Sequence, residues 1–183
     1  MNRSLLRLPL SLLAALVALA APAGGGDRPG TDLFGGYSFA QIDDVNRNGA
    51  NLALGFDLFG PLSGFADASA HWGSQAALSL SDLTLMAGPG VRFGKRGGTV
   101  LFVRALAGLV RDRASIGVLD VDISETSSRL GVLGGGGVDV RLTKKLAVRV
   151  QGDYLWNDTK KESGKSSGFR ASAGVVYRFG MAP

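Results

Sequence analysis

The sequence predicts an all-β protein, an eight-stranded antiparallel up-and-down transmembrane β-barrel preceded by a cleavable signal peptide. Three observations lead to this prediction. From residue 33 to residue 180, apolar residues recur with a period of two, which indicates strands. Short and long connections alternate between these strands. One face of each strand is apolar, whereas the other carries small residues and isolated charges.

The first 23 residues have the anatomy of a secretory signal peptide. Arg3 and Arg7 provide a positive start, and an apolar run with few interruptions follows over 8–21. The run is shorter than the ~20 apolar residues of a spanning helix, so we interpret it as a signal peptide and not as an anchor. The expected organisation is a signal peptide at 1–23, a short periplasmic lead-in at 24–32 and an outer-membrane barrel domain at 33–180.

The composition excludes several classes of protein. The chain has 20 Lys and Arg against 15 Asp and Glu, and this modest excess is scattered, so we expect no nucleic-acid partner. There is no cysteine, which excludes a lipid-anchored cysteine and disulfide bonds. The 28 glycines follow no three-residue period, which excludes a collagen. No residue pattern predicts a cofactor or a metal site.

Eight segments have strand character, at about 33–43, 50–59, 63–73, 82–94, 99–111, 127–142, 146–157 and 167–180. The links after the second, fourth and sixth segments are tight. The other links are longer and more polar, at about 44–49, 74–81, 112–126 and 158–166. Short turns at one end and long loops at the other are typical of outer-membrane barrels, with the turns in the periplasm.

The two faces of the strands distinguish a membrane barrel from a soluble one. A soluble ligand-binding barrel is apolar inside, whereas a membrane barrel is apolar outside. In the segment 146–157, one face carries Val148 and Val150, and the other carries Arg149 and Asp153. Aromatic residues near strand ends on the apolar faces predict two interfacial girdles. These aromatic residues are Tyr37, Phe39, Trp72, Phe93, Tyr154, Trp156, Tyr177 and Phe179.

The polar faces predict an interior network of arginine and aspartate side chains. Unpaired charge inside a narrow barrel is costly, so pairing is expected. The interior of an eight-stranded barrel is just wide enough for side chains to fill. We therefore expect a packed polar lumen and no wide channel. The predicted lumen charges are Asp57, Asp67, Arg92, Arg104, Arg129, Asp139, Arg141, Arg149, Asp153, Arg170 and Arg178.

Three stretches carry a resemblance to a known family. They are DLFGGYSF at 32–39, LGGGGVDV at 133–140 and RASAGVVYRF at 170–179. They resemble the first, sixth and last strands of the small eight-stranded outer-membrane β-barrel family, that of the transmembrane domain of outer membrane protein A. The resemblance covers about 33–180 and implies a bacterial outer-membrane location, with membrane lipid and lipopolysaccharide as partners. We also expect a monomer.

The last stretch is the most specific of the three. Ser172, Gly174, Tyr177 and Phe179 are similar to the C-terminal signal that the barrel-assembly machinery reads in this family. Residues 180–183 follow the last aromatic residue, whereas in many family members that aromatic ends the chain. The resemblance implies that the assembly machinery is a partner during biogenesis.

His71 is the only histidine, and with Ser69 it forms a Ser-x-His pair on one strand face. Some outer-membrane enzymes of similar size deacylate lipid A with His, Ser and an acid, but their motif runs His-x-Ser. We interpret His71 as a hydrogen-bonded interior residue on the same lumen face as Asp67. The sequence therefore predicts that the protein is not an enzyme.

The predicted function is that of a structural or surface-exposed outer-membrane barrel with a packed lumen. Three alternatives stay open: a surface ligand-binding protein or adhesin that acts through its loops, a narrow porin-like channel, and an outer-membrane enzyme that modifies lipid A. The loop at 158–166 holds Lys160, Lys161 and Lys165, which either contact lipopolysaccharide phosphates or are simply solvated.

Overall fold

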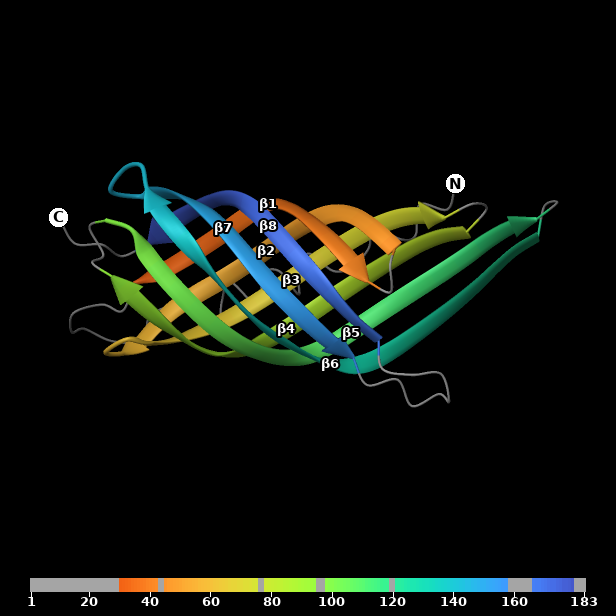
Figure 1. Ribbon diagram of the computed structural model, residues 1–183, viewed down its shortest axis with the longest axis horizontal. Coiled ribbons are helices and arrows are strands. Elements are labelled where there is room, and N and C mark those ends of the chain that lie inside the picture. The colour runs from red at the N-terminus through yellow and green to blue at the C-terminus, as the bar shows by residue number, and fades with distance from the viewer. Residues whose placement is uncertain are drawn as a thin grey trace.

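The computed structural model describes residues 30–42, 45–75, 78–94, 98–118, 121–157 and 166–179. It contains eight strands: β1 (Thr31–Ile42), β2 (Val45–Phe59), β3 (Leu62–Gln75), β4 (Leu78–Gly94), β5 (Val100–Val118), β6 (Val121–Arg141), β7 (Leu146–Asn157) and β8 (Ser166–Phe179). Each strand pairs antiparallel with the next, and β8 pairs with β1, so the sheet closes (Figure 1). The predicted eight-stranded antiparallel barrel is confirmed, while the predicted signal peptide lies outside the described residues.

Burial alternates along the strands as the two-residue period requires. On β5, Phe102 and Leu106 are buried, whereas Leu101 and Leu109 are more than half exposed. The same alternation on the other strands produces an outer surface of exposed apolar side chains, which we call the apolar belt. The belt includes Leu58, Val103, Leu130, Val132, Val148, Val150 and Val175. None of the described residues belongs to a helix that is long and apolar enough to cross a membrane.

The barrel has two unlike ends. β1 begins and β8 finishes at one of them, which we call the terminus end; the other is the distal end. Tight turns close the terminus end, as the sequence predicted. At 60–61, Gly60 adopts a φ of 57°, which glycine tolerates best. At 142–145, the hydroxyl of Thr143 accepts a hydrogen bond from the backbone of Leu146 at 3.0 Å.

At the distal end, most of the predicted loops are strands, and this part of the prediction was wrong. β2 already begins at Val45, β4 at Leu78, and β5 and β6 run to Val118 and from Val121. The apolar alternation stops earlier because these strand ends carry polar side chains such as Arg47 and Asp82, whereas backbone pairing continues. β1 also begins slightly earlier than expected, at Thr31. The predicted loop at 158–166 falls almost wholly outside the described residues.

The β5–β6 hairpin extends well beyond β7 at the distal end, whereas β4 stays paired with β5 as far as Ile116. The pairing of β6 with β7 stops at Gly131 and Asn157, whereas the pairing of β6 with β5 continues to Val118 and Val121. In Figure 1, the green and teal strands β5 and β6 accordingly reach past the others. The remaining strand pairs surround the lumen.

The strands are strongly tilted and staggered around the barrel. Gly30 accepts a hydrogen bond from the backbone of Asp57 at the start of β1. Following the paired residues once around the barrel returns to β1 at Ala40 rather than at Gly30. This stagger brings side chains that are distant in sequence to the same height in the lumen.

Candidate functional site

The lumen at the terminus end is closed by a chain of alternating charges, which we call the mouth chain: Asp57, Arg92, Asp32, Arg149, Asp139 and Arg178. Arg92 Nη1 lies 2.6 Å from an oxygen of Asp32 and 3.4 Å from one of Asp57. Arg149 lies 3.2 Å from Asp32 and 2.6 Å from Asp139. Six strands each contribute one residue, and the carboxylates and guanidinium groups balance in charge.

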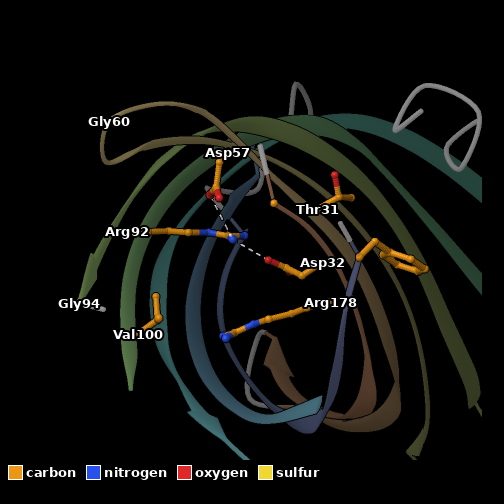
Figure 2. Close-up of a pocket in the computed structure, with 10 residues that line it drawn as sticks. Thr31, Asp32, Asp57, Gly60, Arg92, Gly94, Val100 and Arg178 are labelled. Carbon is orange, nitrogen blue, oxygen red and sulfur yellow. Dashed lines mark hydrogen bonds and ion pairs between the residues drawn. The ribbon is translucent and has the colours of Figure 1, made fainter. Parts of the chain in front are cut away.

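A cavity of about 300 Å³ lies between the strand ends and the mouth chain. In Figure 2, Arg92 reaches between Asp57 and Asp32, and Arg178 points into the same opening. Arg178 Nη2 lies 3.3 Å from Asp139 and so ties the last strand to β6. The charged groups that line the cavity are therefore members of the mouth chain, and the cavity ends on their ion pairs.

Two stacked phenylalanine rings fill the lumen behind the mouth chain. The ring centroids of Phe65 and Phe102 are 5.6 Å apart, and both side chains are buried. The guanidinium carbon of Arg92 lies 4.9 Å from the Phe65 centroid, and that of Arg149 lies 4.6 Å from the Phe102 centroid. Arg104 approaches both rings at 5.9 and 5.8 Å. These cation–π contacts stabilise the guanidinium groups in a part of the lumen that the two rings fill.

The middle of the lumen holds four charged side chains that form a closed ring, which we call the central quartet: Arg104, Asp67, Arg170 and Asp153. Arg104 lies 3.1 Å from Asp67 and 2.9 Å from Asp153. Arg170 lies 2.9 Å from Asp67 and 2.7 Å from Asp153. Each guanidinium group thus pairs with both carboxylates. Because all four side chains are at most 5 % exposed, the pairing is what makes their burial tolerable.

Neutral polar side chains add hydrogen bonds to the quartet. Asn51 donates to Asp67 at 2.9 Å, and Gln151 donates to Asn51 at 2.8 Å across the lumen. Arg170 donates to the hydroxyl of Ser69 at 2.8 Å. Each of these hydrogen bonds lowers the cost of burying a charge, because an unmatched polar group costs free energy in a dry interior.

Beyond the quartet, an aliphatic layer and a second charge chain fill the distal half. The layer includes Ala40, Ile42, Met86, Leu106, Val110, Leu133 and Leu155. The distal chain consists of Arg129, Asp112, Arg47, Asp82 and His71. Arg47 lies 3.0 Å from Asp82 and 3.9 Å from Asp112, and Asp112 also pairs with Arg129. The two arginines and two aspartates of this chain balance in charge.

His71 links Asp82 to a pair of serines. Its Nδ1 lies 3.0 Å from Asp82, its Nε2 lies 2.9 Å from the Ser38 hydroxyl, and Ser38 lies 2.9 Å from Ser172. Ser, His and Asp occur in this order in many hydrolases. Here the Ser38 side chain is fully buried, and the adjacent cavity of about 10 Å³ has room for no more than a water molecule. The arrangement joins three strands but offers a substrate no entry.

Ser69 and His71 share the inner face of β3, but they do not contact each other in the way that the enzyme alternative requires. Ser69 instead lies 2.5 Å from Thr84 and accepts a hydrogen bond from Arg170. His71 is buried and hydrogen-bonded on the same lumen face as Asp67, as expected, but the two do not pair, because residues four apart on a strand are roughly 13 Å from each other. His71 pairs with Asp82 on the neighbouring strand.

The eleven residues of the predicted lumen charge network all lie on strands at positions that face the interior. Ten of them are members of the mouth chain, the central quartet or the distal chain. Arg141 lies at the terminus end, where its Nε donates to the backbone oxygen of Thr143 at 2.9 Å. No group of three or more His, Cys, Asp or Glu in the described part of the chain is arranged to hold a metal ion.

Four charged members of these chains were missed by the sequence analysis: Asp32, Arg47, Asp82 and Asp112. Asp32, Arg47 and Asp112 fell in segments that were interpreted as lead-in or loop. Asp82 was placed at the start of a strand without being assigned to the lumen. The two-residue alternation of each strand, continued past its last apolar residue, would have found them. Asp32 lies two residues from Phe34 and so faces the same side of β1, and Asp82 lies two residues from Thr84 on β4.

The residues of the predicted assembly signal lie on both faces of β8. Ser172 and Gly174 face the lumen. Tyr177 and Phe179 face outward at the terminus end, with their ring centroids 4.8 Å apart in an edge-to-face arrangement. The two aromatic residues therefore lie at the edge of the apolar belt.

The family described as "Outer membrane protein beta-barrel domain" matches residues 10–179. The chain belongs to this family. Family membership and the closed barrel together identify it as an outer-membrane β-barrel protein of the bacterial envelope. The search of the curated proteins gave no match to this chain.

Solved outer-membrane barrels share the fold of this family member at low sequence identity. Neisserial surface protein A (NspA) superposes with a TM-score of 0.61 at 18% identity, covering 85% of this chain and 99% of that one. Ail, the attachment invasion locus protein of Yersinia pestis, gives 0.60 at 16% identity, with 82% and 99% coverage. A major outer membrane protein of Thermus thermophilus gives 0.59 at 10% identity, with coverage of 82% and 99%.

Proposed function

We propose that this protein is a structural, surface-exposed barrel of the bacterial outer membrane whose lumen is closed to solutes. The central quartet carries the proposal. Arg104 and Arg170 each bridge Asp67 and Asp153, so four strands are tied together across the barrel axis. A pore would need these groups to face water instead of one another.

The layers on either side of the quartet support a closed lumen. Phe65 and Phe102 fill the barrel on the side of the mouth chain, and the aliphatic layer fills it on the distal side. The apolar belt supports placement in lipid, since an exposed apolar surface of this extent is typical of membrane contact. We further propose export through the signal peptide at 1–23 and a distal end that faces the cell exterior.

Conductance in a planar lipid bilayer tests the closed lumen. The refolded protein is expected to insert without a stable, large conductance. A known open porin at the same protein concentration serves as the positive control. Stable conductance steps from the wild-type protein would contradict the proposal.

Cell fractionation tests the location separately. The full-length protein is expected in the outer-membrane fraction, as a compact band on an unheated gel that shifts on boiling. A soluble periplasmic product would overturn the membrane assignment, whatever the conductance result.

A second candidate is surface binding, and the protruding β5–β6 hairpin favours it. These strands pair with each other beyond the point where β7 ends, so they present backbone outside the closed barrel. Whole cells that express a variant shortened at 114–125 would lose capture of the ligand or partner that the wild type captures. Equal capture by both would argue against binding through this hairpin. We assign no catalytic role to Ser69 or His71.

A further inference from the structure

The outer face of β5 changes from apolar to positively charged between Leu109 and Arg111. Leu101 and Leu109 belong to the apolar belt, with 55 % and 56 % of their surfaces exposed. Arg111 is also exposed, and Arg113 is partly exposed. Side chains two residues apart share a strand face, so both arginines lie on the same outer surface as the two leucines.

The neighbouring strand β6 shows the same boundary, whereas the apolar face of β4 continues one position further. Leu109 is paired with Leu85 on β4 and with Leu130 on β6, so this row is apolar. The next outward-facing row contains Arg111 with Ser128 on β6 and Leu83 on β4. The boundary of the belt therefore lies between these two rows on β5 and β6, on the distal side of the barrel, and after Leu83 on β4.

An exposed aromatic side chain lies two strands away from Arg113 in the same row of paired residues. Arg113 is paired with Ser81 on β4, and Ser81 is paired in turn with Trp72 on β3. Trp72 is 58 % exposed on the outer surface. Tryptophan is enriched where the hydrocarbon of a membrane meets its headgroups. Because the strands are tilted, Trp72 lies nearer to the terminus end than Arg113, so the two arginines lie at or beyond the depth that Trp72 marks.

The two arginines have no carboxylate partner among the described residues. Asp112, which separates them in sequence, points inward and pairs with Arg129 and Arg47. Two guanidinium groups on successive outward positions are roughly 7 Å apart at their Cα atoms. A guanidinium group binds phosphate oxygens with a planar fork of donors, so the pair matches an anionic headgroup with phosphates.

We propose that Arg111 and Arg113 bind the phosphate groups of lipopolysaccharide in the surrounding leaflet, with the Ser128 and Ser81 hydroxyls as neighbouring donors. The inference rests on the proposed function, because it requires a membrane-embedded barrel with its distal end at the cell surface. The charge complementarity of the arginine pair and its position directly beyond the apolar belt support this occupant.

Binding of purified lipid A by the full-length refolded protein in zwitterionic detergent micelles tests the proposal. Native mass spectrometry counts the bound lipid as the ratio of lipid to protein is raised. The double variant R111Q/R113Q is expected to raise the apparent Kd for bisphosphorylated lipid A about tenfold or more, since charge-assisted hydrogen bonds are lost. Dephosphorylated lipid A is expected to bind the wild type as weakly as bisphosphorylated lipid A binds the variant.

The matched control is K144Q/K145Q, which removes the same charge from two exposed lysines in the turn at the terminus end. Its affinity for bisphosphorylated lipid A is expected to equal that of the wild type. An equal loss in both double variants would reduce the effect to net charge and overturn the site. Equal binding of bisphosphorylated and dephosphorylated lipid A by the wild type would also overturn it, and this comparison needs no variant.

If phosphatidylglycerol binds as tightly as bisphosphorylated lipid A and depends on the same arginines, the site is a general anion site and the assignment to lipopolysaccharide is wrong. If the wild type fractionates outside the outer membrane, the proposed function fails. A wild type that is inserted and heat-modifiable but binds lipid A without regard to Arg111 and Arg113 contradicts only the present inference.

Discussion

Arg104 of β5 and Arg170 of β8 share the same two carboxylates at the centre of the barrel. Each guanidinium group lies within 3.1 Å of both Asp67 and Asp153. Because each carboxylate faces two cations, removing any one member leaves a buried charge without compensation. The ring therefore couples strands that are not hydrogen-bonded neighbours, such as β3 and β8.

Loss of one quartet carboxylate is expected to destabilise the barrel strongly. D67N leaves two buried guanidinium groups with one carboxylate between them, and breaking a buried pair costs about 3–5 kcal/mol. Unfolding by urea in lipid vesicles, followed by tryptophan fluorescence, measures the change. D57N is the matched control, because Asp57 lies at the partly exposed mouth, where we expect a loss of less than about 1 kcal/mol. Equal losses in the two variants would contradict a special role for the centre.

The stacked rings are expected to contribute by filling the lumen. F102A removes a buried ring that contacts Phe65 and Arg149, and such truncations cost about 3–5 kcal/mol. L101A is the control next in sequence, because Leu101 faces outward, where lipid chains can fill the space. The same unfolding measurement compares them. A larger loss from L101A would mean that lipid contact matters more than packing of the lumen.

We expect folding to require glycine at position 135, on the inner face of β6, because Asp153 of the central quartet occupies the space that a side chain would need. A Cβ atom at Gly135 would lie 2.2 Å from an oxygen of Asp153 and 2.5 Å from the backbone oxygen of Gly152. G135A should therefore displace Asp153 and reduce the folded yield. G35A is the control, since its Cβ would meet only the Leu52 side chain at 3.8 Å. The heat-dependent gel shift reports the folded fraction, and equal folding of both variants would refute this explanation.

Replacement of His71 distinguishes a structural role in the lumen from a catalytic role in lipid A modification. H71A removes the link between Asp82 and Ser38, so we expect lower resistance to urea. Lipid A extracted from cells that express wild type or H71A is expected to carry the same acyl chains by mass spectrometry. A difference in acylation between the two strains would revive the enzyme alternative. S69A serves as a parallel variant, because Ser69 belonged to the same hypothesis.

The alternation of residues carried most of the fold prediction. Strand number, the inner and outer faces of β7 and β8 and the tight turns at the terminus end all follow from a period of two and from turn residues. The distal strand ends were missed, because polar residues such as Arg47 and Asp112 lie where the sequence no longer alternates between apolar and polar. Hydrogen bonding between backbones continued the strands there without a signal in the side chains.

The sequence by itself determined that charges would line the interior, since Arg170 and Asp153 occupy inward positions whatever the stagger of the barrel. Only the tertiary structure decided which charges meet. Arg170 reaches Asp67 across 103 residues of sequence, and Arg149 reaches Asp32 across 117. These contacts depend on the tilt that closes β8 onto β1, because the register of that pairing decides which inward side chains lie at the same height in the lumen.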